Sequence, residues 1–164
     1  SVRELCSAVS RECSKYGYEP VMLTDQLCCQ AKEAGSFLAS IAKTHCKSGK
    51  NLAYIAGGET VVNITGHGKG GRNQEIALSA AEGIKGMSNA AVFSIGSDGT
   101  DGPTDAAGGY SDGDTAGVLK NKGIDIFEVL KNNDAYNALK LTEGLIITGP
   151  TGTNVNDVSV LLIG

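Results

Sequence analysis

One stretch limits the possible folds of this chain more than any other: an apolar run that leads into a long loop of glycine and aspartate. Residues 90–95 predict a buried strand that ends at glycine. The loop that follows, 96–114, contains no lysine or arginine and five aspartates. Carboxylates this close repel one another unless they are solvated, paired with distant cations or bound to a metal ion. Because a core strand leads into this loop, we expect a built site here rather than a solvated acidic surface.

Glycine is concentrated in the same part of the chain. Of the 23 glycines, 15 lie between Gly57 and Gly117. Their spacing is too irregular for collagen, and the apolar runs between them exclude a disordered linker. So many glycines predict tight turns and close approaches of the backbone, which places the functional site in the middle of the chain.

The first third of the chain alternates between helical and strand patterns. We expect helices at 2–16 and 27–46 and strands at 20–24 and 52–56, an alternation typical of an α/β domain with a mostly parallel sheet. Residues 57–59 are too few for a parallel crossover, so 60–65 should pair antiparallel with 52–56. The same argument pairs 144–148 with 158–163.

The expected fold is therefore an α/β domain of three layers, with a mixed sheet covered by helices. Further helices are expected at 74–84, 115–122, 126–131 and 134–139. The length of 164 residues predicts a single domain spanning 1–164.

Composition excludes several classes of partner. The net charge of −4 and the lack of a basic run argue against nucleic acid. No apolar segment approaches the length of a membrane span and no leader opens the chain, so we expect a cytoplasmic protein. The five cysteines all precede residue 47 without metal-ligand spacing, and we expect small buried thiols rather than a zinc site.

The segment 66–73 joins a predicted strand to a predicted helix. Gly66, Gly68 and Gly71 match G-x-G-x-x-G formally, but the preceding strand would belong to a hairpin and no GK[ST] follows. The N–H groups at the start of a helix, together with Arg72, suit a carboxylate or a phosphate. The alternative is that Arg72 pairs with a structural aspartate.

A third polar loop, 149–157, follows the strand expected at 144–148. It gathers Thr151, Thr153, Asn154, Asn156 and Asp157. The hydroxyls and amides among them could hold a hydroxy acid or a sugar, or could equally satisfy their own turn. His67 and Glu59 are open candidates of the same kind. Three polar loops at strand ends predict an anion-binding, magnesium-using site.

Four motifs in this order and spacing resemble a known family. They are Gly57-Gly-Glu-Thr60, Gly70-Gly-Arg-Asn-Gln-Glu75, Ser97-Asp-Gly-Thr-Asp-Gly-Pro-Thr-Asp-Ala-Ala107 and Thr148-Gly-Pro-Thr-Gly-Thr-Asn-Val-Asn-Asp157. Together they resemble the C-terminal MOFRL domain of the type 2 glycerate kinases, also labelled hydroxypyruvate reductases. The similarity covers essentially the whole chain but only the second half of the family's proteins, whose N-terminal Rossmann-like domain would be absent here.

The resemblance implies ATP-dependent phosphorylation of D-glycerate, generally at the 2-hydroxyl, with Mg²⁺, in a cleft between the two domains. The partners implied are glycerate, ATP and the N-terminal domain, and a homodimer is possible. An NAD(P)H-dependent hydroxypyruvate reductase and a non-catalytic module that completes a partner's site are the alternatives.

The resemblance also implies roles for particular residues. Catalytic roles fall to Arg72, Asp98 and Asp101, and metal binding to Asp98, Asp101 and Asp105. Substrate or phosphate binding falls to Glu59, Gly70, Gly71, Asn73, Thr100, Thr104, Thr151, Thr153 and Asn154.

Overall fold

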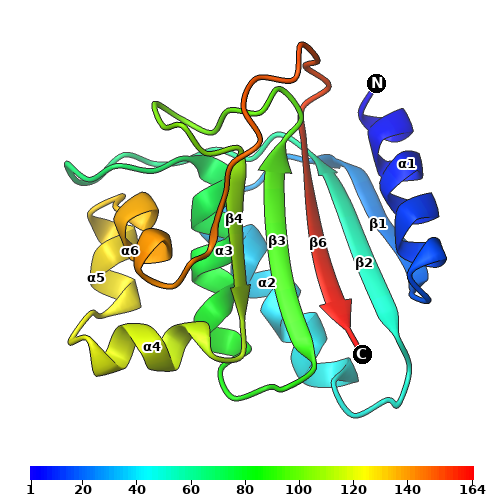
Figure 1. The fold of residues 1–164 in the computed structure, drawn as a ribbon, viewed down its shortest axis with the longest axis horizontal. Helices are drawn as coiled ribbons and strands as arrows, with labels where there is room; N and C mark the ends of the chain where they lie inside the picture. Colours follow the sequence, from blue (N-terminus) through cyan, green and yellow to red (C-terminus); the bar gives the residue numbers. More distant parts are fainter.

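A computed structural model describes all 164 residues as a six-stranded sheet between helices (Figure 1). The strands are β1 (Glu19–Leu27), β2 (Leu52–Gly58), β3 (Ala90–Gly96), β4 (Gly108–Asp112), β5 (Leu145–Ile146) and β6 (Asp157–Ile163), in the sheet order β1-β2-β6-β3-β4-β5. Only β1 and β2 pair in parallel, and every other neighbouring pair is antiparallel. The predicted mixed sheet is confirmed, whereas the expectation of a mostly parallel sheet is wrong.

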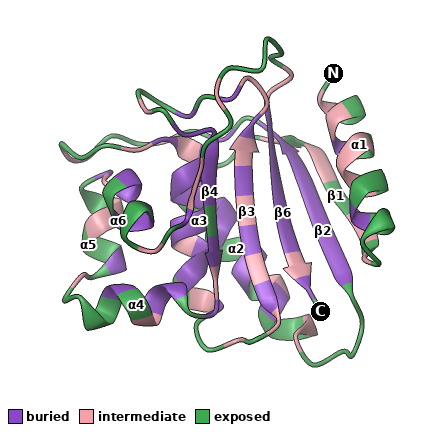
Figure 2. Cartoon of the chain, in the orientation of Figure 1, coloured by how far each residue is buried: buried purple, intermediate pink, exposed green.

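Helices cover both faces of this sheet, which confirms the three-layer arrangement. They are α1 (Val2–Lys15), α2 (Ala31–His45), α3 (Arg72–Gly83), α4 (Thr115–Asn121), α5 (Ile126–Lys131) and α6 (Ala135–Leu141). Figure 1 shows α1 apart from the others, and Figure 2 shows that α3 and the central strands are the most buried elements. The longest helix, α2, has 15 residues, and none of the helices has the length and apolar character that crossing a membrane requires.

The layer formed by α1 is small. Ser1 and Glu4 form a capping box, which satisfies the free N–H groups at the helix start. Cys6 and Cys13 lie on the buried stripe and pack against β2 and β6, where Ile55 and Val160 are fully buried. All five cysteines are free. The expectation of buried thiols holds for these two but is wrong for Cys28 and Cys29, which are exposed.

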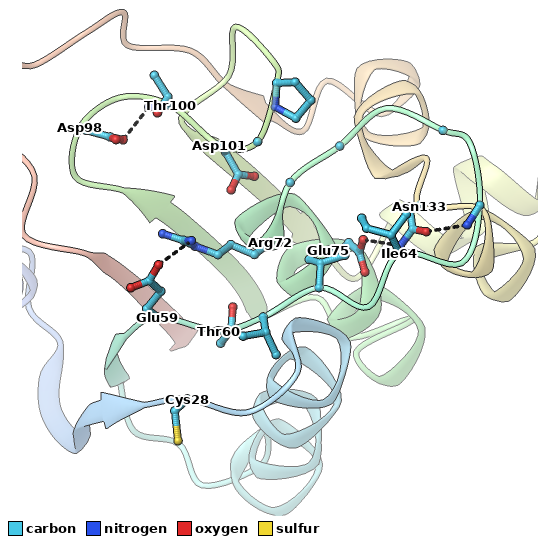
Figure 3. A pocket seen from close by; sticks show the side chains of 18 residues that line it. Cys28, Glu59, Thr60, Ile64, Arg72, Glu75, Asp98, Thr100, Asp101 and Asn133 are labelled. Atoms are coloured by element: carbon cyan, nitrogen blue, oxygen red, sulfur yellow. Dashed lines mark hydrogen bonds and ion pairs between the residues drawn. The ribbon is translucent and has the colours of Figure 1, made fainter.

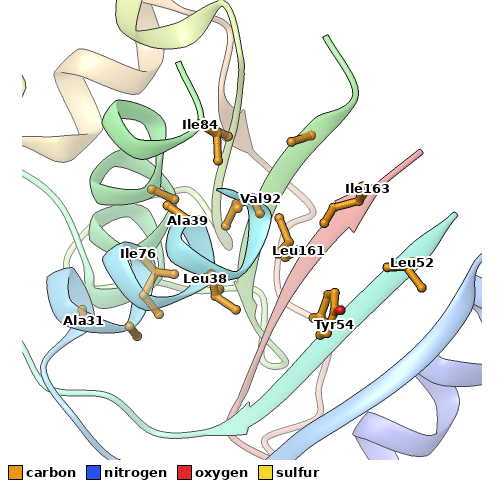
Figure 4. Close-up of a cluster of buried hydrophobic side chains, with 14 residues drawn as sticks. Ala31, Leu38, Ala39, Leu52, Tyr54, Ile76, Ile84, Val92, Leu161 and Ile163 are labelled. Atoms are coloured by element: carbon orange, nitrogen blue, oxygen red, sulfur yellow. The ribbon is translucent and has the colours of Figure 1, made fainter. Parts of the chain in front are cut away.

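The larger core lies on the opposite face, between the sheet and the α2–α3 pair (Figure 4). Leu38 and Ile76 belong to it, and burial of each such side chain contributes about 1.5–3 kcal/mol. Gly35 allows the two helices to approach, since a Cβ there would lie 1.9 Å from Ser79 Oγ and 2.2 Å from the Ile76 carbonyl oxygen. This close contact fixes α3, which carries the start of the candidate site.

The hairpin expected between 52–56 and 60–65 does not form. Strand β2 is bonded to β1 on one edge and to β6 on the other, so neither edge is free. The segment 60–65 is an irregular strap in which Val61 makes one isolated bridge, to Gln30. Its apolar residues line a pocket or face solvent, as Ile64 does with 72% exposure, which explains the strand-like pattern without a strand.

The pairing expected at the end of the chain is also wrong. Strand β6 lies between β2 and β3, while the two-residue β5 pairs with β4. Strand β4 lies inside the stretch expected to be a loop, because Gly108 and Gly109 carry no side chain to signal a strand. A Cβ on Gly108 would lie 1.8 Å from the Ser94 carbonyl oxygen, so the position requires glycine.

Candidate functional site

One large pocket of about 820 Å³ opens where three segments meet (Figure 3). They are the strap, the glycine-rich segment (66–73) and the aspartate loop between β3 and β4 (97–107). In this view the aspartate loop lies on one side, Glu59 and Thr60 lie on the other, and Arg72 projects between them. Its polar lining consists of Glu59, Thr60, Arg72, Glu75, Asp98, Thr100, Asp101 and Asn133, with the glycines Gly66, Gly68, Gly70, Gly71 and Gly102. Two of the three polar loops expected to form the site therefore do meet.

Arg72, the first residue of α3, is engaged by carboxylates. Its Nε and Nη2 donate to the two oxygens of Asp157 at 2.5 and 3.2 Å, and its Nη1 donates to Glu59 Oε1 at 3.0 Å. The Asp157 side chain is only 7% exposed, against 34% for Arg72. The hydrogen bond that Arg72 donates to Asp157 is the main cause that raises the pKa of Arg72. The structure thus shows the alternative of a structural ion pair, with Asp157 as a partner that the site prediction did not include.

Asp101 acts as the cap of α3 from outside the helix. Its Oδ1 accepts from the backbone N–H and side-chain amide of Asn73 at 3.0 and 3.1 Å, and its Oδ2 accepts from the Gln74 N–H at 2.9 Å. Burial raises the pKa of Asp101, although these hydrogen bonds work in the opposite direction. The expectation that the α3 N-terminus offers free N–H groups to an anion is therefore wrong for Asn73 and Gln74, whose N–H groups Asp101 already binds, whereas the Arg72 N–H makes no bond within the chain.

The glycine-rich segment is pinned rather than open. Every backbone N–H from Thr65 to Lys69 donates to the turn between α5 and α6, at Asn132, Asn133 or Asp134. Lys69 also lies over the Tyr136 ring, at 4.1 Å from its centroid. A Cβ on Gly66 would lie 2.3 Å from Asn132 Cα, so glycine here permits packing against backbone. The N–H groups of Gly70, Gly71 and Arg72, which line the pocket, make no hydrogen bond within the chain, so unused N–H groups remain only where the segment enters α3.

The three aspartates expected to bind metal lie in different environments. Asp98 is at the pocket mouth, and the Thr100 N–H that it accepts at 2.9 Å is the main cause that lowers its pKa. Asp101 is engaged by α3, as described above. Asp105 lies outside the pocket lining and accepts from the Tyr136 hydroxyl at 2.8 Å. No group of three acidic, histidine or cysteine side chains comes together as a metal-binding cluster.

The remaining predicted residues lie around the pocket or beneath it. Asn73 is buried with both ends of its amide bonded, to Asp101 and to Ser94. Thr104 bonds Gln74 on the same buried side. Thr151, Thr153 and Asn154 are exposed on a loop that packs on the aspartate loop, where the Thr151 N–H donates to the Asp98 carbonyl oxygen. None of these five lines the pocket.

Sequence reasoning missed three residues that do line the pocket: Thr60, Glu75 and Asn133. Glu75 is 4% exposed, and Asn133 donates to its Oε2 at 3.1 Å. Burial is the main cause that raises the pKa of Glu75, opposed by the bond from Asn133 and the charge of Lys32 and reinforced by the charge of Asp101. Glu75 could have been found from the sequence, because it lies one helical turn after Arg72 and therefore on the same side of the helix.

The charges of the pocket lining do not balance. Four carboxylates (Glu59, Glu75, Asp98 and Asp101) face one cation, Arg72, which is already paired with Asp157 outside the lining. A polyanionic ligand would therefore need positive charge from a metal ion or from groups outside this chain. The pocket lining of this chain supplies hydrogen-bond acceptors, hydroxyl groups and one guanidinium that is already shared with carboxylates.

Comparison with known proteins gives a consistent result. The chain is 50% identical to the D-glycerate 2-kinase of Thermotoga maritima over 99% of its own length, and 45% identical to the glycerate 2-kinase of Pyrococcus horikoshii over 96%. It is also 39% identical to an Agrobacterium vitis protein named "Putative hydroxypyruvate reductase", over 90%. A crystal structure of glycerate kinase (EC 2.7.1.31) from Thermotoga maritima matches all of the chain with a TM-score of 0.95.

These relatives are longer than the chain, which spans 40% of the Thermotoga protein and 37% of the Pyrococcus protein. It corresponds to their C-terminal part. The model of the MOFRL family matches residues 52–157, which include the strap, the glycine-rich segment, the aspartate loop and Asp157. The resemblance carried by the four motifs is confirmed, and the chain belongs to the MOFRL family.

Proposed function

We propose that the protein containing this chain is an ATP-dependent kinase of D-glycerate that forms 2-phosphoglycerate. The observation that carries the proposal is the 50% identity, over 99% of the chain, to a D-glycerate 2-kinase, together with the TM-score of 0.95 to a glycerate kinase. Phosphoryl transfer depends mainly on positioning and on neutralising charge, and needs few covalent steps from the protein. The rigid, polar wall described above suits that task.

In this proposal residues 1–164 form one domain that supplies one wall of the active site. The acidic lining supports a second wall outside this chain, because ATP and glycerate are both anionic and this wall offers no unpaired cation. The longer relatives leave room for a further domain, and that domain would carry the missing positive charge.

Asp98 is the residue that fits a magnesium ion best. It is a partly exposed carboxylate at the pocket mouth with a lowered pKa, and Mg²⁺ typically binds one or two carboxylates together with substrate phosphates. When bound there, Mg²⁺ would screen the charge of the phosphates. Asp101 and Asp105 fit this role less well, since each is held by partners within the protein.

Arg72 and Asp101 have linked roles. Asp101 holds the first turn of α3, and Arg72 extends from that turn into the pocket. Its bonds to Asp157 and Glu59 leave two guanidinium N–H groups for a carboxylate or a transferring phosphoryl group. In this arrangement Asp101 is a positioning residue, and Thr100, Gly70 and Gly71 shape the surface that the ligand meets.

The name of the Agrobacterium relative favours a second candidate, an NAD(P)H-dependent hydroxypyruvate reductase. The only dinucleotide-like pattern is Gly66, Gly68 and Gly71. A dinucleotide fold needs a strand before this loop and free N–H groups in it. Here the strap replaces the strand and the α5–α6 turn takes the N–H groups of Gly66 and Gly68, so the geometry supports the kinase over the reductase.

Two assays on the intact protein test the proposal. D-glycerate with Mg²⁺ and ATP should yield ADP and 2-phosphoglycerate, while hydroxypyruvate with NADH or NADPH should leave the nicotinamide absorbance unchanged. Steady enzyme-dependent loss of that absorbance, without ADP formation, would favour the reductase. The isolated 164-residue chain should show no turnover, because a single wall cannot exclude water from the reacting phosphoryl group.

A further inference from the structure

Two residues of the pocket lining carry polar atoms that have no partner in the protein. Thr60 is 3% exposed, and its Oγ1 makes no hydrogen bond. Glu75 accepts one bond from Asn133, at Oε2, and none at Oε1. Gln74 Oε1 is also buried without a partner, but Gln74 lies outside the pocket lining. Buried polar groups are normally paired, so the unpaired Thr60 hydroxyl and the open oxygen of Glu75, which line the same cavity, indicate places for a ligand.

The structure holds Glu75 firmly in this position. Asn133 donates to Glu75 Oε2 at 3.1 Å and to the Asn63 carbonyl oxygen at 3.2 Å, while its Oδ1 accepts from the N–H groups of Thr65 and Gly66. Asn133 has a φ of 55°, a conformation in the left-handed region that Asn tolerates better than most residues. The Asn133 amide thus uses both of its N–H donors and accepts two hydrogen bonds. From a rare backbone conformation, it holds both the strap and the Glu75 carboxylate in place.

No cation pairs directly with Glu75. The charges that act on it are Lys32, from α2, and Asp101, from the aspartate loop, and neither forms an ion pair with it. A structural carboxylate at this depth would be expected to have a bonded cation or several donors, as Asp157 and Asp101 do. Glu75 has a single amide donor, which leaves its second oxygen for a donor from a ligand.

We propose that Thr60 and Glu75 bind hydroxyl groups of the ligand. A carboxylate accepts from a hydroxyl and repels carboxylates and phosphates, while a threonine hydroxyl can donate or accept. These two residues therefore select the hydroxyl-bearing part of an anionic ligand and direct its charged part towards Arg72 and the pocket mouth at Asp98. The inference rests on the proposed kinase function, in which the hydroxyls belong either to glycerate or to the ribose of ATP.

The test compares Glu75→Gln and Thr60→Val in the intact protein by steady-state kinetics with melting curves. Matched controls are Glu82→Gln, an exposed glutamate of the same helix, and Thr44→Val, an exposed threonine of α2. Loss of a charge-assisted bond should raise KM about 10- to 100-fold for one substrate in Glu75→Gln, and less in Thr60→Val. A rise for D-glycerate assigns the hydroxyl to glycerate, whereas a rise for ATP that is absent with 2′-deoxy-ATP assigns it to the ribose.

The inference is overturned if both KM values stay within twofold of wild type in both variants, or if only kcat falls. If Glu75→Gln does not fold, Thr60→Val decides by the same criteria. Failure of the proposed function looks different, because the wild type itself would then not form ADP from ATP and glycerate.

Discussion

Two sets of residues that line the pocket differ in how far their polar groups are already used. In the Arg72 set, the guanidinium is bonded to Asp157 and Glu59, and the start of α3 is bonded to Asp101. In the set of Thr60 and Glu75, the buried Thr60 hydroxyl has no partner and Glu75 accepts a bond at only one of its two oxygens. The residues that stand out in the sequence thus build the scaffold, while less conspicuous residues carry unused binding capacity. A motif identifies where polar groups are dense and does not tell which of them are free.

The largest expected effect comes from Asp101→Ala. It removes a carboxylate that is 2% exposed and leaves the N–H groups of Asn73 and Gln74 buried without acceptors. We expect a loss of about 4 kcal/mol in the free energy of unfolding, or roughly 10 °C in Tm. Asp101→Asn should lose about half as much, because it keeps one acceptor. Unchanged melting of the alanine variant would show that Asp101 is not the cap.

Arg72→Ala is expected to have the next largest effect on stability. It leaves Asp157 buried without a counter-charge, at a cost of about 2–3 kcal/mol after allowing for the solvent exposure of Arg72. Asp157→Asn in the same background should restore part of the loss, which a double-mutant cycle measures.

The same variants show whether Arg72 also binds the ligand. Arg72→Lys keeps the positive charge but loses the planar guanidinium, which can donate two parallel hydrogen bonds. Its kcat/KM should therefore be little higher than that of Arg72→Ala. If Arg72→Ala melts like wild type but loses activity, the contrast between the two sets of lining residues fails, because the guanidinium would then serve the ligand alone.

A pair of glycine variants tests whether the glycine-rich segment is pinned. Gly66→Ala would push a Cβ against Asn132, and we expect a loss of about 1–2 kcal/mol. Gly117→Ala, in the interior of α4 with open space around it, should instead gain about 0.5–1 kcal/mol. Equal stabilities of the two variants in denaturant titrations would show that the segment yields easily.

The smallest effect concerns the pH dependence of stability. Burial raises the pKa of Glu75. The folded state therefore keeps a proton on this side chain that the unfolded chain releases at about pH 4.3, the ordinary pKa of glutamate. The folded state then binds more protons, so the Glu75 contribution to stability falls as pH rises through the raised pKa. Glu75→Gln should therefore gain stability relative to wild type between acidic and neutral pH. Parallel profiles of the two proteins would contradict this.

The helices and the central strands could be predicted because local patterns determine them. The stripe of α1, the apolar run of β3 and the helical pattern of α3 each carry their own signal. Strand pairing could not be predicted, because it depends on which edges of β2 are free, and β6 comes from the far end of the chain. Strand β4 was hidden by Gly108 and Gly109, whose role appears only from the contact with β3.

The site was predicted in its location but not in the state of its groups. The sequence placed Arg72, Asp98 and Asp101 together, and all three line the pocket. It could not show that Asp101 faces the N-terminus of α3 or that Asp157 meets Arg72, since 27 and 85 residues separate these partners. Thr60 and Glu75 end two of the four motifs but were given no role, because whether a side-chain atom is paired depends on its surroundings in the fold.

The attachment of the glycine-rich segment to the α5–α6 turn has a consequence for folding kinetics. Each of its hydrogen bonds joins two residues whose separation in the chain is between 65 and 68 positions. These bonds cannot form until that length of chain has closed into a loop. Local helices such as α1 have no such requirement. We expect the rim of the pocket to be among the last parts of the domain to assemble, with the ability to bind a ligand appearing only when the remainder is already folded.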